Sequence, residues 1–591
     1  MRAAMTVRAA GVLVAGGLGV VASAAQAEPT ILTVAPADAW MVVHVPSASA
    51  FLDPAEGTTL RRLMDDEELA SFFDARFVDV REAWEERAAD LDLELDELPR
   101  PSGAAGIAIV DIREPGEPLS FEGGVASVVW ADFGDEIDAA EEAIDRLLDD
   151  AIEAGTVTFD EILVGDVELI TVTQSGEADE GANDWDEWDE DTERSGSVTF
   201  GRIGSAYVMS ENADVAIDAA EAAMGERRGG TIGDAADVSE ALASHPADAE
   251  AFVVLRMDPI REGWMTLFED LDGLDGRVFA EVLGLRDVES ISLSFDLDAA
   301  DGPLAMAAHV EMDTKDGLFA LAAKDSGTLS PPAFVRAGAA AGSRGRVEFR
   351  EVIPLIVRVL SNLPEDQREQ AAFFLEQARG IAEPVLNAIG PEFYQVSRFD
   401  EPFAEIGASQ LFATRVSNED VVANTLSLLG GFANATPRDF AGVTIFDLEM
   451  EGQSGAVSGG WLYLGTTATV EDAIRSGGGA GGEGSLAEQD SFMEAMDVMN
   501  GSGVASGYVD LGRTLEWLAF DAKRSIDQAE AFADAMDMSA EDRLVFLGAS
   551  AWIDELPRTE AVTDVIGDFV WSMRSTRNGY RLRMLCLEGD G

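Results

Sequence analysis

Short apolar runs alternate along the chain with segments of helical periodicity. Runs typical of strands, including 40–45, 106–111, 252–257 and 504–509, lie between segments typical of helices, such as 60–73 and 78–91. Asp301-Gly302 and Asn578-Gly579 separate pairs of predicted strands, and such dipeptides form tight hairpin turns because both residues tolerate positive φ. The pattern predicts an α+β fold with antiparallel or mixed sheets, rather than a doubly wound parallel sheet.

One pattern occurs twice without a gap. Gly204–Val215 and Gly459–Val470 each combine an apolar strand, a short polar turn and the start of a helix, and a Pro-Ala-Asp-Ala turn precedes a strand at both 36–39 and 246–249. Such self-similarity is typical of repeat architectures. We therefore expect tandem modules in about two and a half copies. The predicted units are a first at 28–245, a second at 246–499 and a C-terminal half-unit at 500–591.

The first 27 residues have the features of a secretory signal peptide. Arg2 and Arg8 give a basic start, residues 9–25 carry no charge, and Ala25-Gln26-Ala27 is a small-x-small cleavage site. A retained membrane anchor is the alternative, but the run is Gly- and Ala-rich and short for a bilayer. We expect a periplasmic or extracellular protein that has no stable membrane insertion after cleavage.

Charge narrows the choice of partners. The chain has 112 acidic residues against 40 basic ones, which gives a net charge of −72. Such a surface repels phosphates, so binding to nucleic acid or to anionic lipid is not expected. A solvated acidic surface suited to a salty medium is one interpretation, and attraction of cations or of a basic protein partner is the other.

Two segments have low sequence complexity. Residues 175–197 include the acidic run 184–191 with two tryptophans, which predicts a long loop that is either disordered or seats its tryptophans on a partner or a sugar. Residues 477–484 formally contain G-x-G-x-x-G, but they follow a predicted helix rather than a strand. They are therefore interpreted as a flexible linker and not as a phosphate-binding loop.

Catalytic motifs are not apparent. His44, His245 and His309 lie in different predicted modules without the short spacing of a zinc site, and Cys586 lies in an apolar strand where a core role is expected. A Ser-His-Asp triad would need one of these histidines to meet a serine across the fold. No cofactor is expected. Acidic residues are so numerous that no pair can be nominated for glycoside hydrolysis.

Calcium is the one metal for which the sequence offers candidates. Asp296, Asp298 and Asp301 form an oxygen-rich segment before Gly302, but the spacing has one residue too many for an EF-hand start and the closing Glu is missing. The acidic stretch 270–276 also lacks that Glu. A hairpin turn accounts for the first segment equally well.

A family resemblance supports export. The Pro-x-Asp-Ala strand opening, the Gly-strand-helix pattern and the segment S-L-A-E-Q-D-S-F at 485–492 resemble a bacterial exported family of unknown function, domain of unknown function 3352. The resemblance covers most of the chain after residue 27 and implies a signal sequence, but it brings no activity and no site residues. The acidic segment 175–197 departs from the family pattern. We expect a non-catalytic binding or scaffold protein of the cell envelope, with an exported carboxylate-based hydrolase as the alternative.

The charge density predicts a strong salt dependence of stability. We expect the melting temperature to rise markedly between 0.01 M and 1 M sodium chloride, because the Debye length falls from about 30 Å to about 3 Å over that range. Thermal unfolding followed by circular dichroism measures it. An equal rise in micromolar calcium alone would indicate specific ion sites, and a melting temperature flat in both salts would contradict the prediction.

Overall fold

The computed structural model describes most of the chain after residue 28. The described residues are 29–52, 58–72, 99–112, 124–174, 197–227, 229–247, 249–258, 260–261, 280, 282–299, 302–322, 331–361, 365–399, 409–432, 435–448, 452–477, 484–490, 492–493, 503–536, 538–539 and 556–589. The predicted signal peptide, almost all of the acidic segment 175–197 and most of the Gly-rich linker lie outside them. Those expectations remain predictions.

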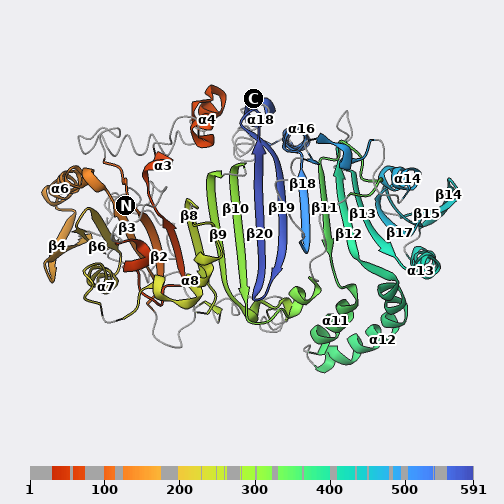
Figure 1. Cartoon of the computed structure of the whole chain (residues 1–591), viewed down its shortest axis with the longest axis horizontal. Coiled ribbons are helices and arrows are strands. Elements are labelled where there is room, and N and C mark those ends of the chain that lie inside the picture. Colours follow the sequence, from red (N-terminus) through yellow and green to blue (C-terminus); the bar gives the residue numbers. More distant parts are fainter. Residues whose placement is uncertain are drawn as a thin grey trace.

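A twenty-stranded sheet runs the length of the molecule (Figure 1), and every pairing between its described strands is antiparallel. Starting from one edge, the first ten strands are β4 (Val157–Val164), β5 (Val167–Gln174), β6 (Ser197–Ile203), β7 (Ala206–Ser210), β3 (Val125–Asp132), β2 (Ala105–Asp111), β1 (Met41–Val45), β8 (Ala251–Arg256), β9 (Val288–Ala299) and β10 (Gly302–Met312).

The remaining ten strands continue from β10 to the opposite edge. They are β20 (Gly579–Glu588), β19 (Ile566–Thr576), β18 (Ala505–Val509), β11 (Ala341–Arg346), β12 (Ile389–Arg398), β13 (Ser409–Val416), β17 (Trp461–Thr466), β16 (Gln453–Ser458), β15 (Val443–Asp447) and β14 (Thr436–Phe440).

The C-terminal strands occupy the middle of this sheet. β20 pairs with β10, and β18 pairs with β11, so the last three strands join the two halves of the molecule (Figure 1). The sheet is also continuous across the predicted unit boundaries, because β8 pairs with β1 and β18 with β11. The predicted units therefore share one hydrogen-bonded sheet.

Helices cover both faces of the outer strands. In the first half α7 (Ala213–Ala223) packs on the face that carries Val208, and α6 (Ile137–Glu153) packs on the opposite face with Tyr207. In the second half α14 (Thr467–Ser476) lies with Tyr463, and α13 (Glu419–Phe432) lies on the opposite face with Leu462. These alternating apolar side chains require cover on both faces, which explains why the outer parts of the sheet lie between helices.

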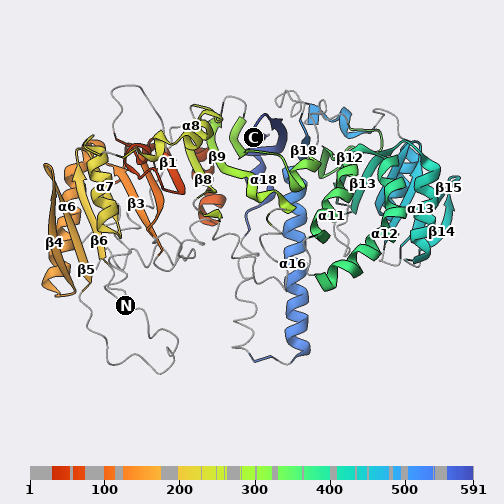
Figure 2. The ribbon, with the colours of Figure 1, turned by 90° about the horizontal axis from the view of Figure 1, so that it is seen from below.

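The other helices lie between strands or at their ends. They are α2 (Ile31–Val34), α3 (Ser49–Leu52), α4 (Thr59–Asp65), α8 (Ala236–Ala243), α11 (Val352–Ser361), α12 (Glu365–Ala388), α16 (Leu511–Ala535) and α18 (Thr559–Thr563). The Asp510 carboxylate caps α16 by accepting a hydrogen bond from the Arg513 amide at 2.9 Å. Figure 2 shows α16 extending away from the body of the sheet. No described helix is long and apolar enough to cross a membrane.

One turn precedes three of the strands. The amide of Ala39 donates to the carbonyl oxygen of Pro36 before β1, and Ala249 donates to Pro246 before β8 in the same way. Ala339 donates to Arg336 before β11, where the Pro-Ala-Asp-Ala sequence is absent. The sequence pattern identified the first two turns, and the third was missed because other residues adopt the same backbone shape.

The observed elements confirm much of the predicted secondary structure. β1, β2, β8 and β18 lie within one residue of the predicted strands, and the predicted α+β class is correct. The predicted helix at 60–73 corresponds to α4 and the helical residues 67–72 after it, while the predicted helix at 78–91 lies outside the described residues.

The position of the last three strands predicts the effect of truncation. A chain that ends at residue 500 would lose the partners of both β10 and β11, and its exposed strand edges should promote aggregation. A chain that ends at Glu588 keeps all three strands and is the matched control. Size-exclusion chromatography and thermal melting compare them, and a soluble truncation that melts with the control would contradict this role.

Candidate functional site

A pocket opens between α14 and the strands β12 and β13. It is lined by Phe334, Arg336, Ala339, Val396, Arg398, Ser409, Leu411, Thr469 and Asp472, and its inner space measures about 20 Å³. That volume holds about one water-sized group. Only a small group, or the head of a larger ligand, fits it.

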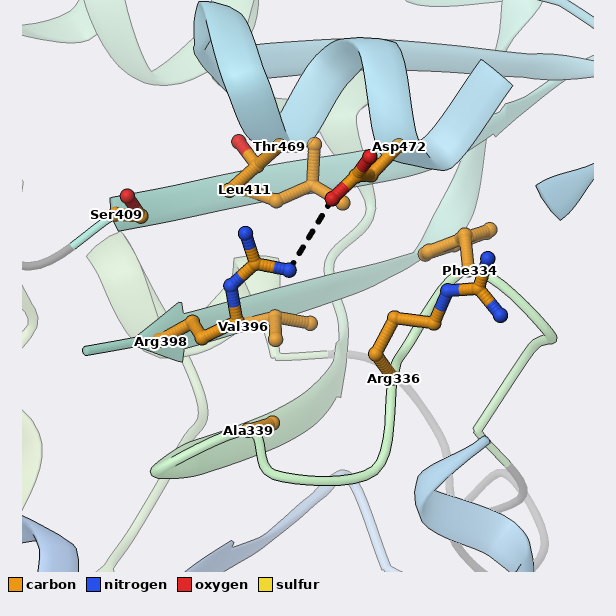
Figure 3. Close-up of a pocket in the computed structure, with 9 residues that line it drawn as sticks. All are labelled: Phe334, Arg336, Ala339, Val396, Arg398, Ser409, Leu411, Thr469 and Asp472. Atoms are coloured by element: carbon orange, nitrogen blue, oxygen red, sulfur yellow. Dashed lines mark hydrogen bonds and ion pairs between the residues drawn. The ribbon is translucent and has the colours of Figure 1, made fainter. Parts of the chain in front are cut away.

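Two arginines provide the positive charge of the pocket (Figure 3). Arg398 leaves β12 and points toward α14, where its Nη1 lies 3.2 Å from Oδ2 of Asp472. Asp472 also accepts from Nη1 of Arg475 at 2.5 Å, so this carboxylate is shared between two guanidinium groups. Opposite charges held this close give charge-assisted hydrogen bonds, and Arg398 is thereby fixed toward the helix.

Arg336 lies on the other side of the pocket, and no described acidic residue pairs with it. It belongs to the turn before β11, and it makes no side-chain hydrogen bond or ion pair with any residue in the described part of the chain. Its backbone is held in place by a bridge to Ser485. Guanidinium groups present planar donors that match carboxylate and phosphate oxygens. An unpaired one in a pocket is therefore suited to binding an anion.

Aromatic side chains form a rigid base beside the pocket. Phe334 is buried and meets Trp461 edge to face at a centroid distance of 5.0 Å and Tyr463 at 5.3 Å. Arg415 stacks 4.0 Å from the centroid of Trp461. Edge-to-face pairs and cation–π contacts stabilise such clusters and fix their geometry. The turn that carries Arg336 is thus attached to a well-packed core.

The fold brings the three histidines together. They lie on one face of the first half, although the sequence placed them in separate modules. His44 of β1 stacks on Phe252 with a centroid distance of 6.3 Å, and His245 meets the same ring edge to face at 6.2 Å. His245 also lies near His309 of β10, whose ring contributes, after burial and Arg581, to lowering the pKa of His245. No group of three ligand side chains that could hold a metal occurs among the described residues.

His245 is held by two serines. Its Nε2 lies 2.8 Å from Oγ of Ser292, and its Nδ1 lies 2.8 Å from Oγ of Ser294. This is a serine–histidine contact of the kind that sequence alone could not exclude. Both serines are almost fully buried, however, so a substrate cannot reach either hydroxyl. The arrangement satisfies buried polar groups and does not form an accessible nucleophile.

Burial keeps these histidines neutral. It lowers the pKa of His44 to about 4 and, together with the positive charge of Arg581, lowers the pKa of His245 to about 4. The pKa of His309 is lowered by the same two causes. A buried imidazole without a carboxylate partner loses the solvation of its charged form, which explains the direction.

Near the histidines, the carboxyl of Glu311 on β10 lies beside that of Glu240 on α8. Glu311 accepts from Oγ of Ser290 at 3.3 Å, and burial beside the Glu240 carboxyl raises its pKa to about 7. A raised pKa is what a general acid requires. The side chain is nevertheless only 4% exposed, so this proton is enclosed in the structure.

Only some of the predicted site residues are among the described residues. Asp296 lies half-buried in β9, Asp298 belongs to the same strand, and Asp301 and the acidic stretch 270–276 lie outside the described residues. The β9–β10 ladder pairs Ala299 with Gly302, as a hairpin at this point requires. Cys586 is buried, and burial raises the pKa of its thiol to about 12. Arg336 and Arg398 were missed because single arginines carry no motif.

Comparisons with known proteins give little. No family model matches the chain, and no curated protein matches it. Among solved structures, crystal forms III, I and IV of TP0453 are similar at 9% identity, with TM-scores of 0.23, 0.23 and 0.22. The form III match covers 45% of this chain and 82% of the other. Similarity at this level supports no argument about function.

The histidine environment predicts how stability changes with pH. The pKa of His44 in the folded protein lies below the unfolded value of 6.5, so the unfolded chain binds a proton first as pH falls. The contribution of neutral His44 to the free energy of unfolding is therefore complete above pH 6.5 and is lost as pH falls toward 4. That loss amounts to about 2 kcal/mol between pH 7 and pH 5. His44→Phe keeps the stacked ring and removes the titrating group. Between pH 7 and pH 5, the free energy of unfolding of the variant should therefore fall by about 2 kcal/mol less than that of the wild type.

Urea unfolding at both pH values measures this difference. Glu311 changes stability with pH in the opposite direction. The stabilisation from its protonated carboxyl is complete below pH 4.5 and is lost as pH rises through 7. It is present in both proteins and cancels in the comparison. Equal losses in wild type and His44→Phe would show that this histidine does not titrate as its burial implies.

Proposed function

We propose that the protein is an exported, non-catalytic binding or scaffold protein, and that the pocket beneath α14 binds an anionic group such as a carboxylate. The observation that carries the proposal is Arg336, whose guanidinium lies in the pocket without an acidic partner in the described part of the chain. In a chain with 112 acids and 40 bases, most arginines can find a carboxylate. Other arginines such as Arg286 and Arg577 also have no ion pair among the described residues, so it is the position of Arg336 in a pocket that sets it apart.

We also propose that the chain consists of two copies of one ten-strand unit, rather than two and a half modules. The strand order supports this. In the first half the ladder runs from β1 through β2, β3, β7, β6 and β5 to β4, and in the second from β11 through β12, β13, β17, β16 and β15 to β14. The bridges Pro36–Thr231 and Arg336–Ser485 occupy matching places.

The two proposed copies differ at the pocket. By register, Val110 and Ala126 of the first copy correspond to Arg398 and Ser409 of the second, because Ile109 pairs with Met41 and Ser397 pairs with Ala341. In the first copy this region belongs to a continuous apolar core that also includes Val34 and Val128. The second copy therefore replaces core residues with polar ones. Replacing apolar core residues with polar ones costs stability unless the polar groups are paired with other groups.

An acidic side chain of the pocket, Asp472, competes with a ligand for Arg398. Asp472 pairs with Arg398, so an incoming carboxylate finds Arg398 occupied, whereas Arg336 has no acidic partner in the part of the chain that the structure describes. Asp472 has a second partner in Arg475, which can retain it if Arg398 turns toward a ligand. This arrangement favours weak, exchangeable binding.

A catalytic role has less support. The alternative hydrolase would need accessible carboxyl groups with separated pKa values, and Glu311 has the raised pKa but lies buried under the region of α8. The serine–histidine contact is buried as well. Export itself rests on the pattern of residues 1–27 and on the family resemblance.

Substitutions in the pocket test the proposal. Succinate and inorganic phosphate are the probes, titrated by isothermal calorimetry at low salt. We expect Arg336→Gln to weaken binding about tenfold or more, since a charge-assisted hydrogen bond contributes about 1.5–3 kcal/mol. Asp472→Asn should strengthen it, because the variant releases Arg398 for the ligand.

Arg146→Gln is the matched control, because it removes one positive charge from an exposed ion pair on α6 in the other half. It should bind as the wild type does. Equal weakening by Arg146→Gln would mean that the probes respond only to overall charge. No measurable binding by any variant would contradict an anion site.

A further inference from the structure

The two edges of the sheet are built differently. β4 pairs only with β5 at one edge, and β14 pairs only with β15 at the other, among the described strands (Figure 1). An edge strand presents unpaired backbone N–H and C=O groups, and proteins usually block it with proline, charge or short length. Comparing the two edges shows which one is open.

β14 is blocked. Its hairpin turn is Ala441-Gly442 with φ of 54° and 81°, so Phe440 and Val443 form the last hydrogen-bonded pair. Because hydrogen-bonded and non-hydrogen-bonded positions alternate, residues 437 and 439 direct their backbone groups outward. Residue 437 is a proline, which has no N–H to donate. The strand is also only five residues long.

β4 is not blocked in this way. It has eight residues and no proline, and its turn at Gly165 has φ of 59°, with Val164 and Val167 as the closing pair. By the same alternation, Phe159, Glu161 and Leu163 direct their N–H and C=O groups away from β5. None of these groups has a hydrogen-bond partner within the described residues. Three consecutive outward positions are therefore available for another strand.

Two large apolar side chains are exposed along this edge. Phe159 is 49% exposed and Leu163 is 76% exposed, and both lie on the same face as Glu161. The alternate residues Ile162 and Val164 instead pack against the core under α7. The strand thus keeps its own core contacts and still presents two large apolar groups around a carboxylate.

The charges of β4 argue against a second copy of this chain. In an antiparallel pair of two β4 strands, outward residues lie opposite outward residues, so the longest registers place Glu161 of one copy opposite Glu161 of the other, or Asp160 opposite Asp160. Like charges directly opposite each other are destabilising. The net charge of −72 adds repulsion between two copies. A strand with a lysine or arginine opposite Glu161 has the complementary charge.

We propose that the outer edge of β4 binds an extended segment of a basic partner protein by strand addition. The backbone groups of Phe159, Glu161 and Leu163 form the ladder, and the segment carries a cationic residue opposite Glu161 with apolar residues two positions to either side. Ladder hydrogen bonds supply affinity in this mode, and alternate side chains supply specificity. The inference does not depend on the Arg336 pocket.

Two labelled synthetic peptides test the proposal by fluorescence anisotropy. One is Thr-Ile-Thr-Lys-Thr-Ile-Thr, and the other has glutamate in place of lysine. We expect the lysine peptide to bind the wild type about tenfold more tightly than the glutamate peptide, because favourable and like-charge cross-strand pairs differ by about 1–2 kcal/mol. Glu161→Pro should lose binding of the lysine peptide, since proline removes the central outward N–H and is tolerated there on an edge.

Asp439→Pro is the matched control, because it introduces proline at an outward position of the other edge, and it should bind the lysine peptide as the wild type does. Glu161→Lys keeps the N–H and should reverse the preference between the two peptides, which keeps the test decisive if Glu161→Pro does not fold. Equal binding of the two peptides, or unchanged binding by Glu161→Pro, overturns the proposal. So does a wild-type dimer in light scattering that becomes a monomer in Glu161→Pro, because the occupant is then a second copy.

Discussion

The structure depends on one long-range pairing, the antiparallel ladder between β10 and β20. Leu304 pairs with Cys586 and Glu311 pairs with Gly579, so segments more than 250 residues apart in sequence form adjacent strands. Closing such a long loop costs entropy that grows only slowly with its length. Burial offsets this cost, because Leu585, Val570 and Tyr508 of the inserted strands are fully buried in the second core. Without that ladder the two halves would share no sheet.

The excess of acidic residues lies at the surface, whereas single arginines form bonds inside the fold. Arg256 donates to the carbonyl oxygens of Ala37 and Ala39 and also pairs with Asp237, which ties the turn before β1 to β8 and α8. Arg513 donates to the carbonyl oxygen of Gly338 in the corresponding turn before β11. Arginines are few in this acidic chain. Arg256 and Arg513 stabilise the fold by bonding to backbone carbonyl oxygens and carboxylates. Arg336 differs from them because its side chain has neither kind of partner among the described residues.

The length of the sheet separates the features that could bind ligands. The pocket is lined by residues of α14 in the second half. Figure 1 shows α14 and the edge strand β4 in opposite halves of the sheet, with the C-terminal strands between them. A continuous ladder holds such sites at fixed positions relative to one another, because each strand is constrained by both neighbours. Ligands bound at the two proposed sites would therefore be held apart from each other.

The sequence by itself determined the local elements, and the tertiary structure decided their faces and neighbours. Alternation and turn residues gave the positions of β1 and β8, and those of the hairpins to within one residue, because these depend on contacts between residues close in the chain. The run Ser290–Phe295 alternates just as clearly, yet its serines are buried and Ile291, Leu293 and Phe295 are only half-buried. Period-two alternation separates two faces but does not say which one is covered. Likewise Arg336, Arg398 and Asp472 come from three distant segments, and the three histidines from separate strands and loops. Only the order of strands in the sheet brings them together, and that order is set by long-range pairing that no local pattern records.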